Sequence, residues 1–235
     1  MEKLDLDFLI FLLETDVSDV RAILLTNPFT YDKGKDWVLF YNPEARKDVC
    51  LVSHYDTVWD DFSKQVICQG NVLKSSDPEI GIGADDRAGV YACLKLAHEV
   101  KWVLFCDGEE MHGIGADSFI ESRPKLTEDF NPKFFIELDR KGKNDAVFYH
   151  EYSNEFIEWV LSFGWTKARG SFSDISKLTP HYKIPSVNLS IGYEAAHRAD
   201  ETLDTNILLN TIRRTKEMID AYDNQTFKIQ FNTRD

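Results

Sequence analysis

Basic residues are scarce in this sequence: 27 Lys and Arg stand against 40 Asp and Glu, which leaves a net charge of −13. A nucleic-acid partner requires a cationic surface, and so does adsorption to an anionic membrane, so we expect neither. The apolar run at residues 8–13 is far shorter than a bilayer span, and the acidic start lacks the basic stretch of a secretory signal. We therefore expect a cytoplasmic protein whose first helix buries this run.

Cysteine is also scarce. The four cysteines lie singly in apolar stretches, without a CxxC pair or the dense spacing of a disulfide-stabilised secreted domain (Cys50, Cys68, Cys93 and Cys106). We expect buried, reduced thiols. Repeats, low-complexity tracts and linkers rich in Pro, Gly or Ser are absent as well, which predicts a single domain over residues 1–235.

Hydrophobic residues make up 43% of the chain and aromatic residues 13%, which is enough for a folded core. Short apolar runs of strand type alternate with segments of helical spacing. The expected strands are 37–41, 49–52, 102–106, 134–136 and 187–191, with a hairpin over 66–74; the expected helices are 3–14, 18–26 (capped by Ser18), 86–99, 153–163 and 204–221. This alternation predicts an α/β protein, a three-layer α/β/α sandwich around a mostly parallel mixed sheet.

Side chains that can carry chemistry follow the ends of the expected strands. His54 and Asp56 come directly after a strand and two residues apart, so the carboxylate can orient an imidazole that binds a metal. Two adjacent aspartates, Asp85 and Asp86, stand among glycine and alanine at the start of a helix. A helix cap would explain Asp86 alone, but not its neighbour.

A pair of glutamates, Glu109 and Glu110, follows the most apolar strand, 102–106. Two carboxylates there repel each other unless a cation or a shared proton separates them, and the natural division is one metal ligand and one general base. Asp139 and His197 follow two further strands. Since the strand ends of an open α/β sheet converge on the ligand crevice, we expect these acids and imidazoles to meet in one site.

The order of these motifs resembles the co-catalytic dinuclear zinc metallopeptidases, the group that includes peptidase T, carboxypeptidase G and the single-domain leucyl-type aminopeptidases. The resemblance spans about residues 48–205 and rests on His-x-Asp, Gly-Ala-Asp-Asp-x-Ala-Gly, Glu-Glu and the late His, in the family's order. The stretch from Ser171 to Asp174, followed by residues 184–192, is also similar to the segment before the family's last ligand. The resemblance implies a zinc-peptidase catalytic domain.

The matched motifs imply a role for each residue. By resemblance, Asp85 would bridge two zinc ions and would be joined to Asp86 by a cis peptide bond. His54 and Asp139 would complete the protein ligands of the first ion. Asp56 would hold the imidazole of His54 in place.

The resemblance assigns the second ion to Glu110 and His197. Glu109 would act as the general base on a metal-activated water and later pass the proton to the leaving amine. The ligands are nitrogen and oxygen only, which suits two Zn²⁺ per chain, with Co²⁺ or Mn²⁺ as substitutes.

The sequence departs from those relatives in which an inserted lid domain supplies the donor for the oxyanion. Only 57 residues separate Asp139 from His197, too few for a lid of ~100 residues, a typical small-domain size. The donor would then come from the core, with Tyr193, His150 and Tyr152 as candidates. Without a lid we expect a monomer, or an oligomer that is not built through a lid domain.

The substrate is indicated by Asp139, because in this family an aspartate at this position is typical of aminopeptidases and of di- or tripeptidases. Acidic residues near the site would attract a substrate ammonium group, and two arginines beside predicted ligands would instead hold a substrate carboxylate (Glu137, Glu151 and Glu194; Arg140 and Arg198). The predicted function is a dinuclear zinc exopeptidase that hydrolyses small peptides.

Three alternatives remain open. The same metal site would serve a deacylase or amidohydrolase of N-acyl amino acids, or a carboxypeptidase. A phosphoesterase is disfavoured because the sequence has neither a Gly-rich phosphate cradle nor a basic cluster near the acids. An inactive binding module is disfavoured because every motif position holds a competent residue.

Overall fold

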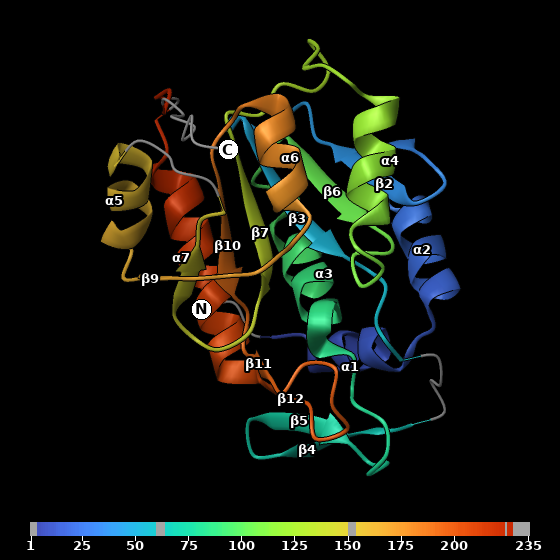
Figure 1. Ribbon diagram of the computed structural model, residues 1–235. Helices are drawn as coiled ribbons and strands as arrows, with labels where there is room; N and C mark the ends of the chain where they lie inside the picture. Colours follow the sequence, from blue (N-terminus) through green and yellow to red (C-terminus); the bar gives the residue numbers. More distant parts are fainter. Residues whose placement is uncertain (1–3, 60–63, 150–153, 224, 228–235) are drawn as a thin grey trace.

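The computed structural model describes residues 4–59, 64–149, 154–223 and 225–227 (Figure 1). Its main sheet has eight strands in the order β1-β2-β6-β3-β7-β10-β8-β9. These strands are β1 (Thr30–Lys33), β2 (Trp37–Tyr41), β3 (Val49–His54), β6 (Trp102–Cys106), β7 (Phe134–Arg140), β8 (Asp145–Val147), β9 (Thr166–Ala168) and β10 (Ser186–Ser190). The central strands β6, β3, β7 and β10 run parallel, while β2 joins β6 and β8 joins β10 in antiparallel pairs.

Helices cover both faces of this sheet (Figure 1). They are α1 (Leu6–Glu14), α2 (Val17–Thr26), α3 (Ala84–Leu96), α4 (Ile114–Ser122), α5 (Asn154–Ser162), α6 (Ile175–Tyr182) and α7 (Thr205–Ala221). Residues of α1, α2, α3, α5 and α7 share one apolar core with the sheet, and residues of α4 and α6 share the other. The predicted three-layer α/β/α sandwich is confirmed.

The central strand β6 is apolar along its whole length because both of its faces are covered. In β6, Val103 and Phe105 point into the core beneath α3, whereas Trp102, Leu104 and Cys106 point into the core beneath α4 and α6. This alternation is the period of two that a strand imposes on its side chains.

A smaller, four-stranded sheet lies beside the main one, in the order β11-β12-β5-β4. Its strands are β4 (Val66–Gln69), β5 (Val72–Ser75), β11 (Tyr193–Glu194) and β12 (Thr202–Asp204). The expected hairpin over 66–74 is thus β4 and β5. The described parts of the segment between Asp139 and His197 form β8, α5, β9, α6, β10 and β11, all within these sheets and their covering helices.

Two local expectations are wrong. Helix α2 is capped by Asp16, whose carboxylate accepts the Asp19 N–H at 2.9 Å, while the Ser18 hydroxyl donates to that same carboxylate. Aspartate and serine are about equally good N-caps, so the residue directly before the first helical position, here Asp16 before Val17, caps α2. Cys68 is exposed on β4, whereas the other three thiols are buried and all four are free.

Among the helices of the described residues, none has the length and hydrophobicity of a membrane-spanning segment.

Candidate metal centre

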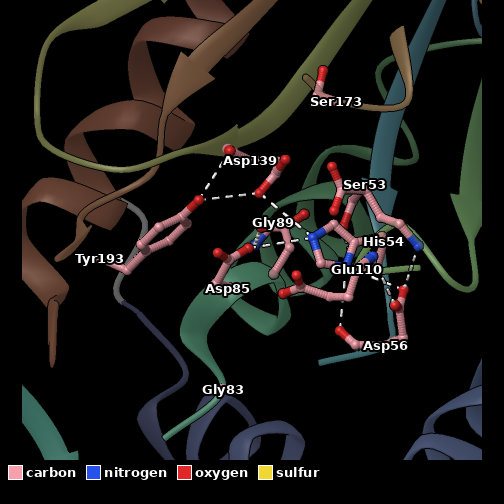
Figure 2. Close-up of polar contacts among 12 residues, drawn as sticks. Ser53, His54, Asp56, Gly83, Asp85, Gly89, Glu110, Asp139, Ser173 and Tyr193 are labelled. Carbon is pink, nitrogen blue, oxygen red and sulfur yellow. Dashed lines mark hydrogen bonds and ion pairs between the residues drawn. The ribbon is translucent and has the colours of Figure 1, made fainter. Parts of the chain in front are cut away.

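Three neighbouring central strands carry polar side chains to one edge of the main sheet (Figure 2). His54 is the last residue of β3, and Asp139 lies one residue before the end of β7. Glu109 and Glu110 lie in the loop that follows β6, which pairs with β3 on the other side. The side chains of His54 and Asp139 are almost fully buried.

Asp85 lies between two imidazoles. Its Oδ1 is 3.3 Å from His54 Nε2, and its Oδ2 is 3.2 Å from His197 Nε2. His54 Nε2 is also 3.6 Å from Asp139 Oδ1, and His197 Nε2 is 2.9 Å from Glu110 Oε1. The five predicted metal ligands therefore meet, and they form two groups that share one carboxylate.

The spacing within each group fits a divalent cation. Ligand atoms that surround one tetrahedral zinc at about 2.0–2.2 Å lie roughly 3.3–3.6 Å from one another. The atoms of His54, Asp85 and Asp139 have separations of 3.3 and 3.6 Å, inside that range. In the group of Asp85, Glu110 and His197 they are 3.2 and 2.9 Å, so a slight expansion would be needed. The nitrogen and oxygen donors thus suit a hard or borderline divalent cation.

Asp86, to which the sequence assigned no ligand role, belongs to the same cluster. Its carboxylate lies within 4.8 Å of ligand atoms of His54 and Asp139, and it is fully buried. Its Oδ1 accepts the Gly89 N–H at 3.0 Å, which is the capping bond expected for the start of α3. The peptide bond between Asp85 and Asp86 is cis, as the resemblance implied.

Asp56 ties the two sides of the centre together. Its Oδ1 is 3.2 Å from His54 Nδ1, so it orients the ring whose other nitrogen faces the cluster. Its two oxygens also accept the backbone N–H groups of Glu109 and Glu110, each at 3.2 Å. Burial acts to raise the pKa of Asp56, but the charge and hydrogen bond of His54 outweigh it and lower that pKa.

Asp139 is held by two neighbours. Asn188 Oδ1 on β10 accepts the Asp139 N–H at 3.0 Å. The hydroxyl of Tyr193 donates to Asp139, with its carbonyl oxygen at 3.0 Å and its Oδ1 at 3.1 Å (Figure 2). Tyr193 was predicted as a substrate contact or oxyanion donor; it lines the cavity described below, and its hydroxyl is directed at the Asp139 carboxylate.

Glu201 is a residue that sequence reasoning missed. It is buried, and its carboxylate accepts the Gly83 N–H at 2.7 Å and the Asp85 N–H at 3.0 Å. Gly83 has φ of +70°, a left-handed conformation that favours glycine. Glu201 therefore fixes the turn that presents Asp85, and it lies four residues after His197 in the loop between β11 and β12. Only that spacing, His-x-x-x-Glu, could have drawn attention to it.

Gly89 allows α3 to approach β7. A Cβ atom there would lie 2.2 Å from the Leu138 carbonyl oxygen and 2.3 Å from the Asp86 carboxylate. Any larger residue would force the helix away from the strand that carries Asp139. Close packing of α3 against β7 thus explains why a glycine stands at this position near the paired aspartates.

The electrostatics of the cluster favour positive charge at its centre. Burial raises the pKa of Glu109 to about 8 and that of Asp139 to about 7, and neighbouring carboxylates add to both shifts. Hydrogen bonds with Asp85 and Glu110 raise the pKa of His197 to about 10. The crowded carboxylates therefore stabilise cations, which is the field that a divalent metal ion requires.

A cavity of about 370 Å³ opens on this cluster. Its lining includes four acids of the centre, two basic residues at the end of β7 and directly after it, and further residues from neighbouring strands and loops (Asp85, Glu109, Glu110 and Asp139; Arg140 and Lys141; His112, Tyr149, Ser171, Phe172, Asn188, Tyr193, Ala196 and His197). Its size lies in the lower part of the range for small-molecule sites, about 300–1,000 Å³.

Other predicted substrate contacts lie elsewhere. Arg198 does not line the cavity; its exposed guanidinium pairs with Asp200 at 2.8 and 3.1 Å. Glu137 is buried beneath α6, where it accepts the Ser173 hydroxyl, and Glu194 is exposed outside the cavity lining. His150, Glu151 and Tyr152 lie outside the described residues.

Comparisons with known proteins identify solved structures that share this fold. No protein-family model matches the sequence, and no curated protein matches it. Among solved structures, aminopeptidase PepT from Bacillus cereus is 16% identical, with a TM-score of 0.70 over 91% of this chain and 96% of its own. A tripeptidase from Staphylococcus aureus is 14% identical, with a TM-score of 0.70 over 91% and 96%.

The TET1 peptidase of Pyrococcus horikoshii, which can assemble into a tetrahedron or a large octahedral shell, is also similar. It is 14% identical, with a TM-score of 0.62 over 88% of this chain and 94% of its own. These matches show that the chain shares the fold of these peptidases, as the sequence motifs led us to expect.

Proposed function

We propose that this chain is a dinuclear metal-dependent exopeptidase that hydrolyses small peptides, of the aminopeptidase or di-/tripeptidase type. The observation that carries the proposal is the placement of Asp85, whose two oxygens face two different imidazoles at 3.3 and 3.2 Å. One carboxylate in that position would serve two ions. The named activities of PepT and of the tripeptidase, which share the fold, support the reaction class.

The two ions would be held by different residues. His54 and Asp139 would hold the first with Asp85, and Glu110 and His197 would hold the second. The nitrogen and oxygen donors suit Zn²⁺, with Co²⁺ or Mn²⁺ as substitutes. When bound, such ions polarise the substrate carbonyl and lower the pKa of a water beside it.

Glu109 would move the proton. Its carboxylate lines the cavity beside Glu110 and Asp85 but is assigned no ion in this scheme. Burial raises its pKa to about 8, so that it can accept a proton from the attacking water and release it to the leaving nitrogen near neutral pH. Asp56 would keep Glu109 in place through its hydrogen bond to the Glu109 backbone N–H.

A second candidate is a deacylase of N-acyl amino acids or a carboxypeptidase with the same metal centre. The observation that favours it is the pair of cations, Arg140 and Lys141, on the cavity wall. Such cations are suited to a free substrate carboxylate. In either case we propose a cytoplasmic protein of one domain that is monomeric, or that assembles without an inserted lid.

The proposal is tested by metal analysis and a substrate panel. The zinc-loaded protein is incubated with aminoacyl-nitroanilides, dipeptides, tripeptides and N-acyl amino acids. We expect close to two ions per chain and turnover of peptides with a free amine. Hydrolysis of N-acyl amino acids alone would establish the second candidate, and a protein that binds no divalent ion would refute both.

A further inference from the structure

The lining of the cavity carries charges of both signs. It includes carboxylates of the metal centre and two adjacent cations, Arg140 at the end of β7 and Lys141 directly after it. The chain as a whole has 13 more acidic than basic residues. Two neighbouring cations that face a cavity are therefore unusual in this protein and need an explanation.

Arg140 has unused capacity to donate hydrogen bonds. Its Nη2 lies 3.5 Å from Asp145 Oδ2 and 3.3 Å from the Arg169 carbonyl oxygen, both near the long limit for such contacts. Its Nε is buried and has no hydrogen-bond partner among the described residues. Arg198, by contrast, is bound to Asp200 through two nitrogens. A guanidinium has five N–H donors, so Arg140 retains donors for a further acceptor.

Lys141 adds a second positive charge on a fixed backbone. It forms no ion pair within the described part of the chain. Its carbonyl oxygen accepts the Ser190 hydroxyl at 2.7 Å, and the Arg140 carbonyl accepts the Ile191 N–H at 2.7 Å. The next residue, Gly142, donates its N–H to the Tyr193 carbonyl at 2.8 Å. The turn is thus tied to β10 and β11, which lowers the entropic cost of using its cations for binding.

We infer that Arg140 and Lys141 form a subsite for a free carboxylate of the substrate. This inference rests on the proposed hydrolase function and specifies its substrate: a short molecule whose scissile bond lies about one residue from an α-carboxylate. An extended dipeptide spans about 7 Å, and the metal centre and the two cations line the same cavity of about 370 Å³, so one substrate can contact both. Dipeptides and N-acyl amino acids share this chemistry, whereas a long peptide would place its carboxylate elsewhere.

The test compares each substrate with its amide. We measure kcat/KM of the zinc-loaded protein on an alanyl dipeptide, on the same dipeptide with a C-terminal amide, and on an N-acetyl amino acid. Hydrogen bonds to charged groups lead us to expect a preference for the free acid over the amide of about 10- to 100-fold, mainly in KM. Equal kcat/KM for acid and amide would overturn the subsite. The dipeptide and N-acetyl arms separate a free-amine from an N-acyl substrate.

Variants locate the preference on the two residues. In the double variant Arg140→Met/Lys141→Met we expect kcat/KM for the acid to fall to that for the amide, so that the preference for the acid disappears. Circular dichroism and metal content report that the variant is folded. Lys143→Met is the matched control, because Lys143 lies in the same turn but does not line the cavity; it should keep the preference. A double variant that loses acid and amide hydrolysis in equal proportion would contradict the inference.

A binding measurement separates this inference from the proposed function. If the wild-type protein cleaves no substrate in the panel, it is the hydrolase assignment that fails. Calorimetry with the Glu109→Gln variant then compares the uncleaved dipeptide acid with its amide. Tighter binding of the acid by about 10-fold or more, lost in the double variant, supports the subsite. Equal affinities refute it.

Discussion

The two halves of the metal centre are supported by different parts of the fold. The inner half, His54 and Asp139, lies at the ends of two central strands, and its side chains are 1% and 8% exposed. The outer half consists of Glu110 and His197. Its histidine lies in the loop between β11 and β12 of the small sheet and is 52% exposed. Packing on both faces of the main sheet fixes the inner half, whereas loops position the outer half.

This contrast shows how a single carboxylate can join a rigid scaffold to a surface loop. Asp85 belongs to neither sheet, since it lies in the irregular first turn of α3, and it faces His54 on one side and His197 on the other. Glu201 then binds the backbone of that turn from the same loop that carries His197. The two histidines differ in burial, whereas the side chains of Glu110 and Asp139 are similarly buried, and the two halves are not independent.

The most severe change removes the group that both halves share. We expect Asp85→Ala to lose both ions and all activity, because each half would keep only two of its predicted protein ligands. Metal content after purification and kcat on a dipeptide check this. Asp200→Ala, an exposed aspartate nearby, is the control and should retain both. Full metal content in Asp85→Ala would show that the two halves do not depend on a shared carboxylate.

The glutamate pair separates chemistry from binding. Glu109→Gln should leave both halves loaded but lower turnover by about 10²–10⁴-fold, the usual contribution of a general base. Glu110→Ala should instead reduce the metal content of the outer half alone. Metal titration and kcat of each variant distinguish the general-base role of Glu109 from the ligand role of Glu110. A Glu109→Gln protein with wild-type turnover would eliminate the proposed mechanism.

The Glu201→Gln variant tests whether the loop between β11 and β12 holds Asp85 in place through the hydrogen bonds of Glu201. The amide keeps the size of the side chain but replaces one of the two acceptor oxygens with a donor, which would face a backbone N–H. We expect metal affinity to fall by about 10- to 100-fold, as for other groups that support metal ligands, without loss of the fold. Glu194→Gln, an exposed position near the same loop, is the control. Unchanged affinity in a folded variant would leave Glu201 with a purely structural role.

The last expected effect concerns the pH dependence of stability and the buried side of the centre. Burial, with the charge of Glu109 in addition, raises the pKa of Asp174 on the α6 side to about 7. Between its ordinary value and about 7, the folded protein holds this proton and the unfolded chain does not. Stability should therefore fall as pH rises through that window, with a slope of about 1.4 kcal/mol per pH unit for one proton.

Asp174→Asn removes that titration, so its unfolding free energy should depend less on pH between about 5 and 7. Urea unfolding of wild type and variant in the presence of a chelator measures this. Ser176→Ala, two residues along, is a control that leaves the carboxyl group in place. Parallel pH profiles of wild type and Asp174→Asn would show that the carboxyl group titrates normally.

The features that could be predicted from the sequence are those that a short segment specifies by itself. The strands at Trp37–Tyr41 and Trp102–Cys106 were predicted to the residue, because each is an uninterrupted apolar run of five residues, as strands covered on both faces often are. The five residues that we propose as ligands drew attention because each stands next to a strand end or in a glycine-bounded segment, and the family resemblance then implied their roles. The fold and the meeting of these residues followed from that regularity.

Other features depend on contacts that no short segment contains. Glu201 acquires its role from Gly83, which lies 118 residues earlier in the chain. The strands β8, β9, β11 and β12 have two or three residues each, too few to show a period. Helix α6 contains Pro180, which argues against a helix in sequence, yet its apolar residues pack against β7 and β10. Tertiary packing decided these elements.

The order of the ligands along the chain has a consequence for the protein's synthesis. β8 precedes β10 in sequence but joins the main sheet only through β10 and β9, and His197 follows β10. Domains begin to fold from the N-terminus as they are made. A ribosome that has reached residue 190 has thus exposed the inner half and Asp85, but not His197 or Glu201. We therefore expect the proposed hydrolytic capacity to arise only with the last fifth of the chain, so that an interrupted product would be inert toward the peptides around it.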